Sequence, residues 1–160
     1  MVVVSDTSPV VCLAHLKNIN LLEKLFGKVL IPVSVYNELL QSDIIDNHFL
    51  QQNSFFTIKN PVNTVIVKKL RKQLDIGESE AIALSIEERP EFLLIDESLG
   101  REIALHYNLR IKGTLGILLL GKERDYLSEI KPLIFQLQEE INFRIKPSLL
   151  QLILQKANEQ

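Results

Sequence analysis

The sequence predicts an α/β fold in which helices cover both faces of a mainly parallel sheet. Three short apolar runs, Val2–Val4, Lys28–Ile31 and Phe92–Ile95, have the length and composition of buried strands. Segments with helical periodicity fill the intervals between these runs. Strands that alternate with helices along a chain are typical of a parallel sheet, because each crossover helix packs on one face of it.

Weaker patterns complete the expected order of elements. Leu109–Lys112 is a weaker strand and Phe55–Ile58 a possible extra one. Pro9 occupies a first-turn position of the first helix, and Thr7 or Ser8 is its expected N-cap. Further helices are expected over residues 18–26, 33–41, 62–74, 77–88, 99–107, 114–122, 130–140 and 148–156.

Length and composition favour one domain without a membrane segment. The chain has 160 residues, 46% of them hydrophobic, and no repeat or linker divides it. We expect a single domain over residues 1–160, with a core over about 1–122 and a helical C-terminal extension over about 128–157. The single cysteine, Cys12, excludes an internal disulfide and a cysteine-based zinc site. The start of the chain does not resemble a secretory signal, so a cytoplasmic protein is expected.

Two carboxylates follow predicted strands and indicate a site. Asp6 comes directly after the first strand and Asp96 after the third. The carboxyl ends of parallel strands lie at one edge of a sheet, which is where such sheets bind ligands. Two carboxylates brought together there repel each other, and a divalent cation such as Mg²⁺ or Mn²⁺ is the simplest compensation.

Two further acids lie on flanking helices. Glu38 borders the buried face of the helix over residues 33–41, and Glu78 begins the helix over residues 77–88. Each acid taken alone has a purely structural alternative. Asp6 and Asp96 are both candidate helix caps, Glu38 a solvated side chain, and Glu78 an acid favoured by the helix dipole. Their joint occurrence favours a shared site.

Five segments in order resemble the successive motifs of PIN-domain proteins. They are VVSDTSPVVCLAHL, VLIPVSVYNELL, LDIGESEAIALS, LLIDESLGREIA and IKGTLGILLLGKE, and the resemblance runs from Val2 to about Lys122. The sequence is most similar to the VapC-like group, whose members open with S-D-T-S-P and contain G-E-x-E-A. This resemblance implies a three-layer α/β/α fold and an acidic cluster that binds Mg²⁺ or Mn²⁺. It also implies metal-dependent hydrolysis of phosphodiester bonds, usually in RNA.

The resemblance also implies which residues act. The catalytic and metal-binding acids fall on Asp6, Glu38, Glu78 and Asp96. Participation of Glu80 and Glu97, and the number of metal ions, stay open. The small polar residue that the family places near the metal falls on Thr114 or Ser8, and we expect both to contact substrate. Arg101 follows Asp96 by little more than one helical turn, so it is expected either to hold a phosphate or to pair with Glu97.

These expectations define two classes of function. The first is an Mg²⁺- or Mn²⁺-dependent endoribonuclease, the toxin of a prokaryotic toxin–antitoxin pair. It would bind RNA and a small antitoxin protein and form a homodimer. The alternative is a catalytically silent PIN-like interaction or regulatory protein. The chain has no P-loop, its three histidines lie in no motif, and the basic run Lys68, Lys69, Arg71 and Lys72 is expected to be a solvated helix face.

Overall fold

A five-stranded sheet forms the centre of the molecule, and all of its strands are parallel. The computed structural model describes residues 1–160, and the order of strands across the sheet is β3-β2-β1-β4-β5. The predicted α/β class is therefore confirmed. In chain order the strands are β1 (Val2–Ser5), β2 (Lys28–Ile31), β3 (Phe56–Ile58), β4 (Phe92–Leu94) and β5 (Ile111–Lys112).

Helices occupy the intervals between the strands and the whole C-terminal part. None of them has the length and apolar character needed to cross a membrane. The short α4 is the one helix that the sequence patterns did not predict, because four residues are too few to show helical periodicity. The helices are α1 (Thr7–His15), α2 (Asn20–Phe26), α3 (Val33–Gln41), α4 (Phe49–Gln52), α5 (Thr64–Leu70), α6 (Ile76–Glu88), α7 (Ser98–His106), α8 (Thr114–Glu123), α9 (Lys131–Glu140) and α10 (Pro147–Lys156).

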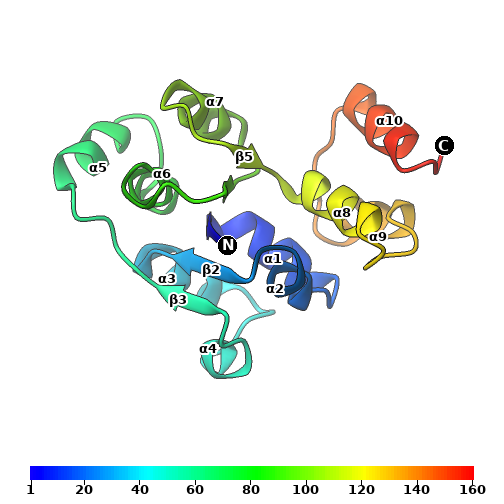
Figure 1. Cartoon of the computed structure of the whole chain (residues 1–160), viewed down its shortest axis with the longest axis horizontal. Helices are drawn as coiled ribbons and strands as arrows, with labels where there is room; N and C mark the ends of the chain where they lie inside the picture. Colours follow the sequence, from blue (N-terminus) through cyan, green and yellow to red (C-terminus); the bar gives the residue numbers. More distant parts are fainter.

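Alternation of side chains along the strands divides the buried apolar residues between the two faces of the sheet. Val3 and Val29 belong to a core of 26 buried residues that includes side chains from α1, α2, α8, α9 and α10. Val4 and Leu30 belong to a second core of 11 buried residues, to which α5, α6 and α7 contribute. Figure 1 shows α5, α6 and α7 on one side of the molecule and α8, α9 and α10 on the other. The sheet and the helices packed on its two faces form the three expected layers.

The start of α1 differs from the prediction. The N-cap position is occupied by Asp6, whose side chain makes no capping hydrogen bond, and the helix already includes Thr7 and Ser8. The expectation that Thr7 or Ser8 caps this helix is therefore wrong. Both hydroxyls donate instead to carboxylates from distant parts of the chain, Glu38 and Asp96.

Glu159 ties the three C-terminal helices together. Its carboxylate accepts hydrogen bonds from the backbone N–H groups of Ile130 and Lys131 at the start of α9, each 2.9 Å long at the shortest. It also forms an ion pair of 2.8 Å with Lys122 near the end of α8. Burial alone would raise the pKa of Glu159, but these hydrogen bonds hold it below its ordinary value. The carboxylate thus stabilises the packing of α10 against α8 and α9.

We expect Glu159→Gln to lower the free energy of unfolding by about 2 kcal/mol, the value of hydrogen bonds to a charged group. An amide retains one acceptor oxygen, and its NH₂ faces donors it cannot pair with. Urea denaturation at neutral pH measures the loss. Glu139→Gln, which alters an exposed carboxylate on α9 that forms no ion pair, is the matched control. Equal losses for the two variants would contradict the assignment.

Candidate active site

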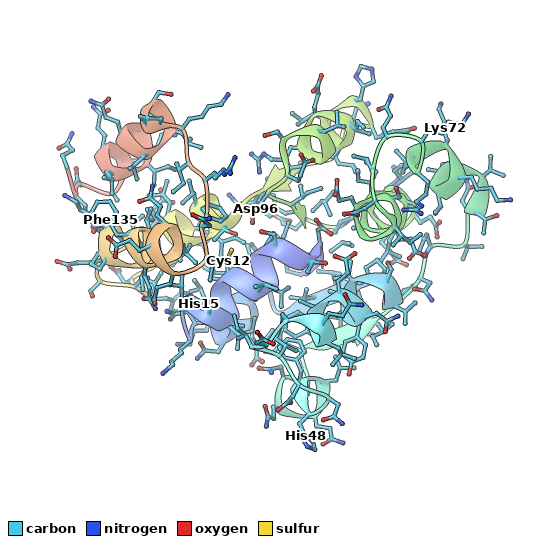
Figure 2. All side chains as sticks on the ribbon, turned by 180° about the vertical axis from the view of Figure 1, so that it is seen from behind. Cys12, His15, His48, Lys72, Asp96 and Phe135 are labelled. Atoms are coloured by element: carbon cyan, nitrogen blue, oxygen red, sulfur yellow. The ribbon has the colours of Figure 1, made fainter.

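The register of β1 and β4 places Asp6 and Asp96 at the same edge of the sheet. Ser5 pairs with Leu94, and the Asp6 backbone N–H donates to the Leu94 carbonyl at 2.9 Å, which extends the ladder by one residue. Asp96 therefore lies in the loop that follows β4, close enough for its charge to act on Asp6. Figure 2 shows Asp96 near the middle of the molecule, at the level where the two flanking groups of helices meet. This is the edge at which parallel sheets bind ligands.

Three donors from two helices fix the Asp96 carboxylate. The Thr114 backbone N–H donates to Oδ1 at 2.7 Å, and the Thr114 hydroxyl donates to Oδ2 at 2.6 Å. The Ser8 hydroxyl donates to the same Oδ2 at 2.7 Å. The helix after Asp96 is capped by Glu97, which accepts from the Gly100 N–H at 3.0 Å. Asp96 was a candidate both for the cap of this helix and for the site. Glu97 provides the cap, so Asp96 is left for the site.

Asp6 is buried among other acids. Burial raises its pKa to about 7; a hydrogen bond to the Thr7 backbone opposes the rise, and the charges of Asp75, Glu38 and Asp96 add to it. Burial also raises the pKa of Glu38, whose Oε2 accepts the Thr7 hydroxyl at 2.8 Å. The Thr7 hydroxyl therefore holds Glu38 on the side of the site where Asp6 lies. A nearby cation would lower the pKa of the Asp6 and Glu38 carboxyl groups and so favour their ionised forms.

Two acids at the start of α6, Asp75 and Glu78, complete a group that we call the carboxylate cluster. Its other members are Asp6, Glu38 and Asp96. Burial raises the pKa of Glu78 to about 8, and Asp75 adds to the rise through a hydrogen bond and through its charge, followed by Asp6. Asp75 also accepts the Glu78 backbone N–H at 2.8 Å as the N-cap of α6. Glu80 contributes to neither the Asp6 nor the Glu78 pKa shift. Asp75 is the acid that sequence reasoning missed.

Three glycines make room for these carboxylates. A Cβ on Gly77 would lie 2.5 Å from Glu38 Oε1 and 3.5 Å from Asp6 Oδ1, so both oxygens face the space beside the α6 backbone. A Cβ on Gly100 would lie 3.2 Å from Glu78 Oε2. A Cβ on Gly113 would lie 2.9 Å from both Asp96 Oδ1 and Arg101 Nη1. A side chain at any of these positions would force a neighbouring side chain to move, which at Gly100 includes Ile95.

Gly77→Ala is expected to lower catalytic activity about tenfold without loss of stability. The new methyl group displaces the flexible Glu38 side chain, whereas alanine favours the helix by up to about 1 kcal/mol relative to glycine. Activity assays and urea denaturation together measure the two effects. In a Glu38→Ala background the same change should have no further effect on activity, because the displaced carboxylate is already absent. Additive losses would show that Gly77 acts elsewhere.

Arg101 brings a positive charge to the rim of the cluster. Its Nη1 donates to the Ile95 carbonyl at 2.8 Å, which holds the half-buried guanidinium beside Gly113 and Asp96. Arg101 forms no ion pair, so the pairing with Glu97 that its position also allowed is not formed. The remaining N–H groups of the guanidinium are free to bind an anion.

The chemistry of the cluster fits a hard divalent cation. None of its carboxylates forms an ion pair with a Lys, Arg or His side chain. All of its donors are oxygens, which Mg²⁺ and Mn²⁺ prefer. As the side chains are arranged, no three Asp, Glu, His or Cys groups converge closely enough to hold one ion. The acids in question are Asp6, Glu38, Asp75, Glu78 and Asp96.

Comparison with known families agrees with this geometry. A family model described as a PIN domain matches residues 2–159 of the chain. No curated protein matches it. PIN domains are generally nucleases, and PIN nucleases generally use divalent metal ions. Since the match leaves out only the first and the last residue, the chain belongs to the DUF3368 family of PIN domains.

Proposed function

We propose that this protein is an Mg²⁺- or Mn²⁺-dependent endoribonuclease. The observation that carries the proposal is a set of carboxylates without cationic partners at the ligand-binding edge of a PIN-domain sheet. Burial and mutual repulsion raise the pKa of Asp6 and of Glu78, and a divalent cation relieves both effects.

The roles of the residues follow from their surroundings. Asp6 and Asp96 would hold the metal, with Glu38 and Glu78 beside them. When bound, the ion would supply Lewis-acid stabilisation of the charge that develops on the phosphate and would ease deprotonation of the attacking water. Ser8 and Thr114 keep Asp96 oriented through its Oδ2, so we assign both to positioning; substrate contact, expected from the sequence for both, is kept for Ser8, because Thr114 is completely buried.

Arg101 is suited to the substrate side of the reaction. Its guanidinium lies beside Asp96 and has no carboxylate partner. A planar guanidinium binds phosphate through two parallel hydrogen bonds, and the Ile95 carbonyl fixes its position before substrate arrives. Arg101 would therefore hold a phosphate of the RNA next to the carboxylates.

The biological setting is part of the same proposal. The S-D-T-S-P and G-E-x-E-A motifs support a place among VapC-like toxins of prokaryotic toxin–antitoxin pairs, acting in the cytoplasm. Such a toxin would form a homodimer and bind a small antitoxin protein. The exposed Leu149 and Leu152 on α10 provide an apolar face for one of these contacts.

The test is cleavage of a labelled single-stranded RNA by the purified protein. We expect cleavage with MgCl₂ or MnCl₂, none with excess EDTA, and recovery when the metal is restored. Asp6→Asn and Asp96→Asn serve as inactive controls. Cleavage that persists unchanged in EDTA and in both variants would come from a contaminant. A complete absence of cleavage would favour the silent, regulatory alternative.

A further inference from the structure

The end of α5 presents a concentration of positive charge. Lys68, Lys69, Arg71 and Lys72 are all exposed, in agreement with the solvated helix face expected from the sequence. None of them forms an ion pair. The whole chain has a formal net charge of −2, so this local charge contrasts with its surroundings. Unpaired cations close together attract a polyanion.

These cations do not lie on a flat surface. Two of the lysines line a groove of about 480 Å³ between the end of α5 and the C-terminal half of α7, which we call the α5–α7 groove. It contains a tyrosine and a histidine but no carboxylate. Its lining residues are Lys69, Leu70, Lys72, Gln73, Ile103, His106 and Tyr107.

Two segments of the chain connect the α5–α7 groove with the carboxylate cluster. Gln73 lines the groove and Asp75 belongs to the cluster, and two trans peptide bonds keep their Cα atoms within about 7.6 Å. On the other side, the first turns of α7 carry Gly100 and Arg101 at the cluster, and its last turn reaches the groove with His106. Figure 2 shows Lys72 at the outer edge of the molecule and Asp96 near its middle. The groove therefore lies toward the outer edge of the molecule, and both α7 and the segment before α6 run from it to the cluster.

We propose that the α5–α7 groove binds the sugar-phosphate backbone of a single-stranded RNA and leads the strand into the carboxylate cluster. This inference rests on the proposed function, because it names the path by which that substrate reaches the site. Lys69 and Lys72 contact phosphates, and the half-buried Tyr107 offers its ring to a base. An acidic protein segment would satisfy the lysines alone, whereas a polynucleotide also uses the ring and can extend along α7 to the carboxylate cluster.

Binding of RNA without cleavage tests the proposal. The probe is a fluorescein-labelled single-stranded RNA of mixed sequence, about 20 nucleotides long, titrated with full-length protein in EDTA and an Asp6→Asn background. The double substitution Lys69→Gln/Lys72→Gln is expected to weaken binding about tenfold at moderate salt. It should also lower the slope of log K against log[salt] by about 1.4, since each single-strand phosphate contact contributes about 0.7.

A matched control removes the same charge elsewhere. Lys146→Gln/Lys156→Gln alters two exposed lysines that flank α10 and form no ion pair, and we expect it to bind RNA like the parent. If both double variants lose RNA affinity equally, only net charge matters, and the proposal that the groove binds RNA is overturned. Retained RNA binding together with lost binding of a polyglutamate peptide would also overturn it, in favour of an acidic protein partner.

Binding and cleavage separate the two proposals. If the wild-type protein cleaves RNA and the Lys69/Lys72 variant still binds it as the control does, the groove is wrong and the proposed function stands. If no RNA is cleaved but the variant loses RNA binding, the groove stands and the nuclease assignment fails. Circular dichroism of both double variants excludes unfolding as the source of any difference.

Discussion

Asp6→Asn and Asp96→Asn should each reduce metal-dependent RNA cleavage by at least about 100-fold, because loss of a charged ligand costs more than the 10–100-fold typical of its supporting residues. Single-turnover cleavage of a labelled RNA at saturating Mg²⁺ or Mn²⁺ measures the effect. Glu80→Gln is the matched control: it neutralises an acid of the same helix as Glu78 that takes no part in the cluster. A similar loss of cleavage in Glu80→Gln would contradict the assignment of the metal-binding acids.

The same two substitutions should change stability in opposite directions. The Asp6 charge is buried and repelled by three neighbouring acids, so a neutral amide should stabilise the metal-free protein at pH 8 by roughly 2–4 kcal/mol. Asp96 instead accepts three hydrogen bonds, and Asp96→Asn should cost about 1–3 kcal/mol. Urea denaturation in EDTA compares them. Two losses of equal size would show that Asp6 carries no electrostatic strain.

Metal-free protein should be less stable at pH 8 than at pH 5. The pKa of Asp6 rises from 3.8 to about 7 on folding and that of Glu78 from 4.5 to about 8, so the folded state binds more protons than the unfolded state across this range. The free energy of unfolding therefore falls as the pH rises from about 5 to 8, by up to about 2.7 kcal/mol per pH unit, since each of the two groups contributes about 1.4. Thermal or urea unfolding in EDTA across this range measures the slope.

A divalent cation should oppose this dependence. Mg²⁺ or Mn²⁺ binds the ionised carboxylates of the folded state, and at a hundredfold excess over its Kd it adds about 2.7 kcal/mol. The gain should be larger at pH 8 than at pH 5, where protons compete with the metal. Asp6→Asn should reduce the pH dependence to the part that Glu78 contributes and lose the response to the metal. A wild-type curve that is flat in EDTA would contradict the raised pKa values.

The sequence predicted the parts of the site that follow from strand ends. Asp6 and Asp96 each end an apolar run, and in a parallel sheet that position alone places them at one edge. Asp75 was missed because an aspartate three residues before a helical glutamate is an ordinary capping pattern, and nothing local distinguishes a cap that also faces other acids. The only sign in the sequence that Asp75 lies near the site is its position three residues before Glu78.

Long-range contacts explain the remaining difference. The local preference of serine and threonine for helix starts predicted a cap from Thr7 or Ser8. The fold instead brings Asp96, 88 residues away, within 2.7 Å of the Ser8 hydroxyl, and Glu38 within 2.8 Å of the Thr7 hydroxyl. A charged acceptor outweighs a backbone N–H that solvent can reach. Such a competition is decided by tertiary structure, which one sequence does not display.

Gly77, Gly100 and Gly113 give the site a vulnerability of another kind. Glu38, Glu78 and Asp96 each lie against a glycine of a neighbouring segment, so volume as well as charge limits which residues these positions accept. A relative that retains every carboxylate but has alanine or serine at these three places would have a crowded, misaligned site. A survey that judges activity by counting acids would classify that protein as an enzyme, whereas one that also inspects the glycines would not.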